Sequence, residues 1–260
     1  MISGLHLLLD SDSGNSETEE YSVPVSIPQD IPNEHNPRGY ATKIRTIFVD
    51  IFLSTIRTIQ DTFCAKFITL LMGNQEPIKA SKYFTDNFEM DGVILCAAET
   101  HVKISVPQHD KHLFFYKDNA YTLNVLMISD HTKRIRYVIA RFSGAFHDGY
   151  IWDASDVDQF FRKYRNYKIL GRSGSFYSPK PWLVKPISDA VPNSSNAKFN
   201  FKHAKALYGA EDCFNLLKNR FRCILGSRPL PFTPQECATI INVCCALHNM
   251  CIEYNVPEIL

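Results

Sequence analysis

Between residues 92 and 142 the chain changes its hydrophobic period, and this change limits the folds that it can adopt. Four short runs rich in β-branched and aromatic residues, with polar turns between them, lie at 92–98, 112–117, 120–129 and 135–142. Such runs predict β-strands, because branched and aromatic side chains pack well on a pleated surface. Residues 153–164 then have the pattern of a helix, and residues 167–170 form a short apolar run that suits a buried parallel strand.

Helical patterns flank these strands on both sides. Residues 41–72 place apolar side chains at mostly three- and four-residue steps, which predicts one or two amphipathic helices. A proline-broken loop from Ser173 to about Asn196 precedes two further helical patterns, at 204–223 and 233–254. Because strands and helices follow one another in this order, we expect an α/β layer fold with a mixed sheet flanked by helices.

The first 39 residues differ from the rest of the chain in charge. They carry seven acidic residues and one basic residue among repeated Ser, Asn and Pro, which predicts a disordered acidic tail. The remaining residues hold 27 basic and 20 acidic side chains, a formal excess of seven positive charges. A surplus of this size suits binding to a polyanion such as DNA, and it is equally common on an ordinary solvated surface.

The eight cysteines show no CxxC pair and several lie in apolar runs, which predicts free, buried thiols in a reducing compartment. Cys244, His248 and Cys251 would share one face of a helix, but that face is otherwise apolar, so core thiols are favoured over a metal site. No run reaches the roughly 18 to 20 apolar residues of a membrane span, and the opening residues lack a basic, secretory start. We therefore expect a soluble intracellular protein without a membrane partner.

Several stretches, taken in order, resemble the nuclease domain of Harbinger transposases and their domesticated relatives. GVILCAAETHVKI (92–104) is similar to a family strand that ends in Asp-Gly-Thr-His. AYTLNVLMISD (120–130) and RFSGAFHDGYIW (141–152) resemble the family's tyrosine-asparagine strand and its Gly-Ser-x-His-Asp turn. Residues 210–225 and 241–252 resemble its Glu-x-x-Phe helix and its closing Leu-His-Asn helix. The chain is identified as a degenerate, domesticated member of this family of DDE superfamily endonucleases.

This resemblance implies an RNase H-like core in which two aspartates and a glutamate hold divalent metal ions for phosphodiester hydrolysis. Two nearby cations activate the attacking oxygen and stabilise the leaving one, and clustered carboxylates overcome the repulsion between them. The family's first aspartate falls on Ala98, the second on Arg172, and the glutamate on Glu211. Arg172 brings a fixed positive charge to the place of a cation. We therefore expect no cofactor and no cleavage, with Mg²⁺ or Mn²⁺ as the metal if the chain is an active endonuclease.

Neighbouring acids offer a rearranged catalytic site as the alternative. Glu99 follows the lost position, but successive side chains in a strand point to opposite faces unless a bulge re-aims one of them. Asp148 matches a family aspartate that accompanies the site, so a rearranged site would use Asp148, Glu211 and Glu99. Otherwise Glu211 is a solvent-facing acid near a helix start. His101 and His147 also follow the family pattern, and structural hydrogen bonding is the simpler interpretation of both.

Four basic residues are candidate contacts to DNA phosphates: Arg172, Lys218, Arg220 and Arg222. The last three lie on one expected helix, where they either follow a phosphate backbone or keep the helix surface soluble. Arg172 either offers its planar fork to a phosphate at the vestigial site or pairs with Glu211 or Asp148.

The resemblance also predicts how the chain is organised in space. Residues 1–39 form the tail, 40–90 a helical remnant of the helix-turn-helix-like region of active relatives, and 91–255 the RNase H-like domain. Since parallel neighbours need a crossover, we expect strands 92–98 and 167–170 to lie side by side, with Glu211 projecting from a helix towards their ends.

The function that follows from this sequence is that of a catalytically inactive, nuclease-like protein in the nucleus, with the cytoplasm as the alternative location. It would bind DNA or protein as a scaffold, and the resemblance implies a Myb/SANT-like nuclear partner. Two alternatives stay open: a metal-dependent endonuclease with a rearranged site, and a decaying gene copy without a selected role.

Overall fold

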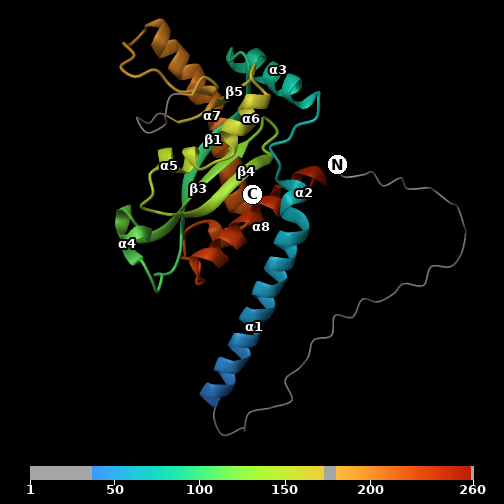
Figure 1. Cartoon of the computed structure of the whole chain (residues 1–260), viewed down its shortest axis with the longest axis vertical. Helices are drawn as coiled ribbons and strands as arrows, with labels where there is room; N and C mark the ends of the chain where they lie inside the picture. Colours follow the sequence, from blue (N-terminus) through green and yellow to red (C-terminus); the bar gives the residue numbers. More distant parts are fainter. Residues whose placement is uncertain (1–36, 173–179, 259–260) are drawn as a thin grey trace, which may run out of the picture. The chain divides into compact units, whose positions relative to one another are not determined.

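The computed structural model describes residues 37–172 and 180–258 (Figure 1). The expected disorder of the acidic tail therefore concerns residues that lie, apart from 37–39, outside the described part of the chain. The chain divides into two units, Met1–Ile47 and Phe48–Leu260. Helix α1 (Pro37–Ile59) contains the described residues of the first unit and continues into the second. The second unit holds the sheet and every residue discussed below.

A mixed sheet forms the centre of the second unit. Its strands are β1 (Val93–Lys103), β2 (Phe115–Tyr116), β3 (Ala120–Ser129), β4 (Ile135–Ser143), β5 (Lys168–Leu170) and β6 (Leu183–Val184). The order is β2-β3-β1-β5-β6, and β4 also pairs with β3. Strand β3 is antiparallel to β1, β2 and β4, whereas β5 runs parallel to β1 and β6 parallel to β5. This arrangement confirms the expected RNase H-like α/β fold and the pairing of the two predicted parallel strands.

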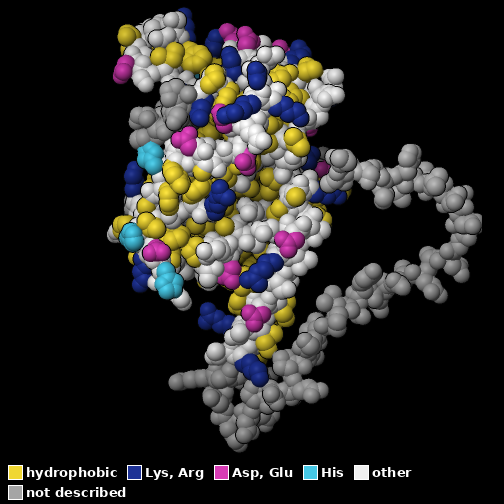
Figure 2. Space-filling model, in the orientation of Figure 1, with side chains coloured by type: hydrophobic (Ala, Val, Ile, Leu, Met, Phe, Trp, Pro, Cys, Tyr) yellow, Lys and Arg dark blue, Asp and Glu magenta, His cyan; other side chains and the backbone are white. Residues whose placement is uncertain are grey.

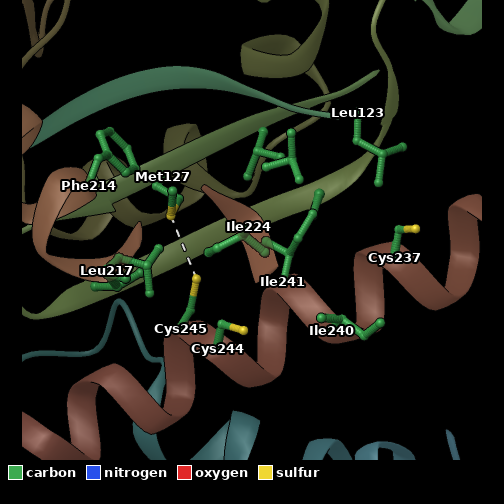
Figure 3. Packing of buried hydrophobic residues seen from close by; sticks show 14 of the residues in the cluster. Leu123, Met127, Phe214, Leu217, Ile224, Cys237, Ile240, Ile241, Cys244 and Cys245 are labelled. Carbon is green, nitrogen blue, oxygen red and sulfur yellow. Dashed lines mark hydrogen bonds between the residues drawn. The ribbon is translucent and has the colours of Figure 1, made fainter. Parts of the chain in front are cut away.

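Helices cover both faces of the sheet, because side chains alternate along each strand. Helices α5 (Asp148–Asp153) and α6 (Val157–Lys163) form the crossover between β4 and β5 and pack on the face that carries Leu126. Helices α7 (Ser195–Arg220) and α8 (Pro234–Glu253) pack on the face that carries Met127. Figure 3 shows α8 turning Ile241 and Cys245 towards β3, where the Cys245 thiol lies 3.6 Å from the sulfur of Met127.

The structure confirms the helices expected before the sheet. It also shows a further helix, at 76–88, that the sequence pattern did not predict. After α1 come η1 (Gln60–Cys64), α2 (Ala65–Phe67) and α3 (Glu76–Phe88). Helix α3 is amphipathic: much of its surface is polar, and Ala80 and Phe84 are buried. Pro77 suits its first turn, and Glu89 ends it in the left-handed conformation.

The strand predicted at 112–117 is wrong over most of its length. Asp110 adopts the left-handed conformation and starts the short helix α4 (Lys111–Phe114), so two residues remain to pair with β3. The loop expected after Ser173 contains β6, which the backbone of Trp182 and Val184 joins to β5. Residues 173–179 lie outside the described part of the chain. The helix predicted at 204–223 begins earlier, at Ser195, because the Ser194 hydroxyl accepts a hydrogen bond from the Ala197 amide.

The closing helix α8 is fixed to the sheet by buried polar groups of its Leu-His-Asn sequence. The Asn249 side chain is 0% exposed, accepts a hydrogen bond from the Ile135 amide at 2.8 Å and donates to the Ile135 and Phe67 carbonyls. His248 Nε2 lies 2.9 Å from the Lys133 carbonyl, and burial lowers the pKa of His248. His248 and Asn249 therefore have a structural role, because they join the closing helix to the rest of the fold.

The eight cysteines are free, and five of them are buried, which confirms the expected thiols. No helix among residues 37–172 and 180–258 has the length and apolar character to cross a membrane.

Candidate functional site

The three positions expected to hold metal ligands lie on three adjoining elements. Strands β1 and β5 are parallel, with Cys96 opposite Leu170, so Ala98 and Arg172 each lie two residues beyond this paired position. Helix α7 packs along β1 on the face of Ala98. Glu211 lies on α7 and reaches the end of β5, as expected from the sequence. The three positions expected from the sequence therefore lie on neighbouring elements of the fold.

Two of these three side chains form an ion pair in place of a metal site. The guanidinium of Arg172 donates a hydrogen bond to the Glu211 carboxylate, and the two side chains are 50% and 37% exposed. Ala98 is 1% exposed and belongs to the apolar cluster with Cys213 and Phe214 of α7. A pair of divalent cations needs several clustered carboxylates, and here a cation of the protein neutralises the retained one. These residues do not fit a metal pair.

Glu99 lies on the opposite face of the sheet from Glu211. The β1–β3 register runs without a bulge from Cys96 to Lys103, so strand alternation turns Glu99 away from α7. Its Oε1 accepts a hydrogen bond from Trp152 Nε1 of α5 at 2.8 Å. Among the described residues, no group of three or more His, Cys, Asp and Glu side chains is placed to hold a metal ion.

Asp148 and the motif histidines gather on the same face as Glu99. Asn124 of β3 lies opposite His101 of β1, and its Nδ2 donates to Asp148 Oδ1 at 2.7 Å. His147 precedes α5 and accepts a hydrogen bond from the Gly149 amide at 3.4 Å. His101, His147 and Asp148 line one cavity of about 620 Å³. The structure therefore separates Asp148 from Glu211, on opposite faces of the sheet.

The basic residues expected on α7 do not form one exposed row. Lys218 Nζ donates to Thr100 Oγ1 at 2.9 Å, and burial lowers the pKa of Lys218. Arg220 donates to the Val256 carbonyl at 2.9 Å, whereas Arg222 in η3 (Arg222–Ile224) is exposed. Two of the three candidate phosphate contacts are thus engaged by other parts of the protein.

A second group of basic residues, which the sequence analysis did not single out, lies on and after α6. Figure 2 shows Lys and Arg side chains gathered over this helix. The exposed residues here are Arg162, Lys163, Arg165 and Lys168, and we call them the α6 basic patch. Its signal in the sequence is the segment FFRKYRNYK (160–168), in which basic residues alternate with aromatic ones. This composition is typical of surfaces that contact nucleic-acid phosphates.

The family of the chain follows from its similarity to known proteins. Residues 99–249 match the family described as DDE superfamily endonuclease. This match covers more than half of the chain, so the chain belongs to that family.

Proteins of similar sequence occur in animals and in plants. The human protein "Putative nuclease HARBI1" is 28% identical over 167 residues, which make up 63% of this chain and 46% of that protein. "Protein ALP1-like" of Arabidopsis thaliana is 25% identical over 172 residues, 59% of this chain and 41% of that protein. The chain is therefore a Harbinger-derived, nuclease-like protein that spans less than half the length of these relatives. No solved structure gives a significant match.

Proposed function

We propose that this chain is a catalytically inactive nuclease-like protein that acts in the nucleus by binding DNA or a protein partner. The observation that carries the proposal is the ion pair between Arg172 and Glu211 at the expected metal position. A guanidinium has no lone pair for a metal and supplies no nucleophile, but it keeps the positive charge that a cation would bring. When the guanidinium exchanges Glu211 for a phosphate group, such a site binds DNA without hydrolysing it.

The α6 basic patch supports the DNA-binding part of this proposal. Arg162 is 77% exposed, and its pairing with Asp158 at 3.1 Å leaves it at the surface. Lys and Arg contacts to phosphates position a protein on DNA without selecting a sequence. Sequence-specific binding would then require a separate protein that contacts the bases. We propose a Myb/SANT-like nuclear partner for this role.

We expect no cleavage of duplex DNA by the purified chain in the presence of Mg²⁺ or Mn²⁺. The physical reason is that one neutralised carboxylate does not hold two cations. Nicking of a supercoiled plasmid measures this activity, with a Glu211→Gln variant purified in the same way as the control for contaminating nucleases. Cleavage by the wild type that disappears in Glu211→Gln would contradict the proposal and favour the rearranged site.

Arg172 is expected to contribute one phosphate contact to DNA binding. In Arg172→Ala, binding to duplex DNA should weaken, and the slope of log affinity against log salt should fall by roughly one. Glu211→Gln should act in the opposite direction, because it frees the guanidinium from its partner. Fluorescence anisotropy over a salt series measures both variants, and Arg134→Ala, which loses an exposed pair with Glu253, is the matched control. An unchanged slope in Arg172→Ala would remove Arg172 from the interface.

A further inference from the structure

The cavity beside His101 has aromatic walls that the proposed function does not use. The His101 and Tyr116 rings stack with centroids 3.5 Å apart and form one side of it. Phe115 and Phe146 also line it and are 46% and 36% exposed. Figure 2 shows hydrophobic and histidine side chains together on the surface over α4 and α5. Because these rings are partly exposed, a flat aromatic ligand could stack on them.

The polar groups of this cavity are mostly hydrogen-bond acceptors. Asn124 is 1% exposed, and its Nδ2 donates to the Phe146 carbonyl and to Asp148 Oδ1. Both hydrogens of this amide are thus used, and the carboxylate is held in one orientation. Asn124 Oδ1 has no hydrogen-bond partner among the described residues, and the Asp148 carboxylate next to it is half-buried. A buried acceptor without a donor costs free energy, which a ligand carrying N–H groups would recover.

Cations lie next to a ring of the cavity and next to the aromatic cluster that continues from Phe146. Lys117 Nζ lies 5.9 Å from the centroid of Tyr116, and the Arg141 guanidinium lies 5.4 Å from that of Phe142. The rings of Phe142, Phe146 and Tyr150 contact one another, with centroids 5.1 to 5.7 Å apart. Aromatic faces with neighbouring positive charges are the surfaces on which single-stranded nucleic acids stack their bases and place their phosphates.

We propose that this cavity receives one unpaired base of a nucleic-acid strand. The base stacks on Phe146, and its exocyclic amino group donates to the Asp148 carboxylate, while Lys117 and Arg141 attract the flanking phosphates. A volume of about 620 Å³ lies within the range of small-ligand sites and admits a nucleoside. The inference rests on the proposed DNA binding and adds a site, on the opposite face from Arg172, that takes a base extruded from a duplex or present in a single strand.

The acceptor character of the site predicts which bases it prefers. Cytosine presents an amino donor at N4, which carboxylates accept, whereas thymine presents the O4 acceptor at the same position. A fixed carboxylate therefore favours cytosine and repels the thymine oxygen. In Asp148→Asn, the new amide keeps its oxygen on Asn124 Nδ2 and turns its NH₂ group to the ligand, so the preference should disappear or reverse.

The test measures the anisotropy of labelled single-stranded oligo-dC and oligo-dT on titration with the full chain. We expect the wild type to bind oligo-dC at least about five-fold more tightly than oligo-dT. Phe146→Leu should weaken binding of both strands by about five- to a hundred-fold, because it removes the stacking face and keeps apolar bulk. Asp148→Asn should leave the affinity for oligo-dT equal to or above that for oligo-dC. Phe201→Leu, at an exposed phenylalanine of α7, is the matched control.

Two further outcomes separate this inference from the proposed function. If duplex DNA binds normally while Phe146→Leu and Asp148→Asn bind both strands as the wild type does, the base site is wrong and the DNA-binding proposal stands. If neither duplex nor single-stranded DNA binds the wild type, both fail together. Far-ultraviolet circular dichroism of each variant identifies loss of fold, and 2-aminopurine placed within the oligo-dC gives a second readout. Its fluorescence should be quenched on wild-type protein and restored on Phe146→Leu.

Discussion

Replacing Asn249 with alanine is expected to lower the free energy of unfolding by about 3 to 5 kcal/mol. The side chain is buried between α8, β4 and α2, where it holds the Ile135 amide and the carbonyls of Ile135 and Phe67. Its removal leaves three buried backbone groups without partners, and each such group costs about 1 to 3 kcal/mol before the structure relaxes. Urea denaturation followed by circular dichroism measures the difference.

Asn242→Ala is the matched control for this experiment, because it makes the same substitution on the same helix. Asn242 Oδ1 has no hydrogen-bond partner among the described residues, so its loss should change stability by less than about 1 kcal/mol. Equal effects of the two substitutions would show that Asn249 does not bridge the helix and the sheet in the way described.

Placing aspartates at positions 98 and 172, where the family has them, is expected to create a divalent-cation site together with Glu211. In the Ala98→Asp, Arg172→Asp double variant, we expect three carboxylates to meet, one from the middle of β1, one from just beyond the end of β5 and one from α7. Their mutual repulsion and the burial of residue 98 should destabilise the metal-free protein. Mn²⁺ at 100 times its dissociation constant should then raise the apparent free energy of unfolding by about 2.7 kcal/mol.

The control for this variant is the Ala98→Asn, Arg172→Asn pair, which has nearly the same shape without the charges. Thermal denaturation with and without Mn²⁺ compares the two, and adding Glu211→Gln to the aspartate variant should abolish most of the stabilisation. Equal responses of the aspartate and asparagine pairs to Mn²⁺ would mean that the three positions do not converge. The sheet register and the position of Glu211 on α7 would then need revision.

The sequence predicted the long elements of the fold because their residues have a strong local preference. Strand β3 buries eight consecutive residues, and helix α8 is apolar along much of its length, so both stand out in the sequence without any knowledge of the fold. Short elements carry too few residues for such a signal. Strand β6 has two residues and exists because β5 offers it hydrogen-bond partners, and α4 depends on a left-handed Asp110.

The candidate site was predictable where it depends on the order of the sequence motifs and on the alternation of side chains along a strand. The motifs placed Ala98, Arg172 and Glu211, and strand alternation correctly turned Glu99 to the other face. Side-chain partners were not predictable, because they depend on elements far apart in the chain. The contact of Lys218 with Thr100, the exposure of the α6 basic patch and the aromatic cavity all arise when helices and strands pack together.

The short strands β5 and β6 have a consequence for the Arg172–Glu211 ion pair. The β1–β3 ladder pairs eight residues on each strand, whereas β5 has three residues and β6 two. Local opening costs least where few backbone hydrogen bonds and few apolar contacts must break. We therefore expect the β5–β6 part of the sheet to open at a lower free energy than its antiparallel half, and such an opening would separate the Arg172 guanidinium from Glu211. The Arg172–Glu211 ion pair would then form and break with this opening, and we expect the amides of β5 and β6 to exchange hydrogen faster than those of the β1–β3 ladder.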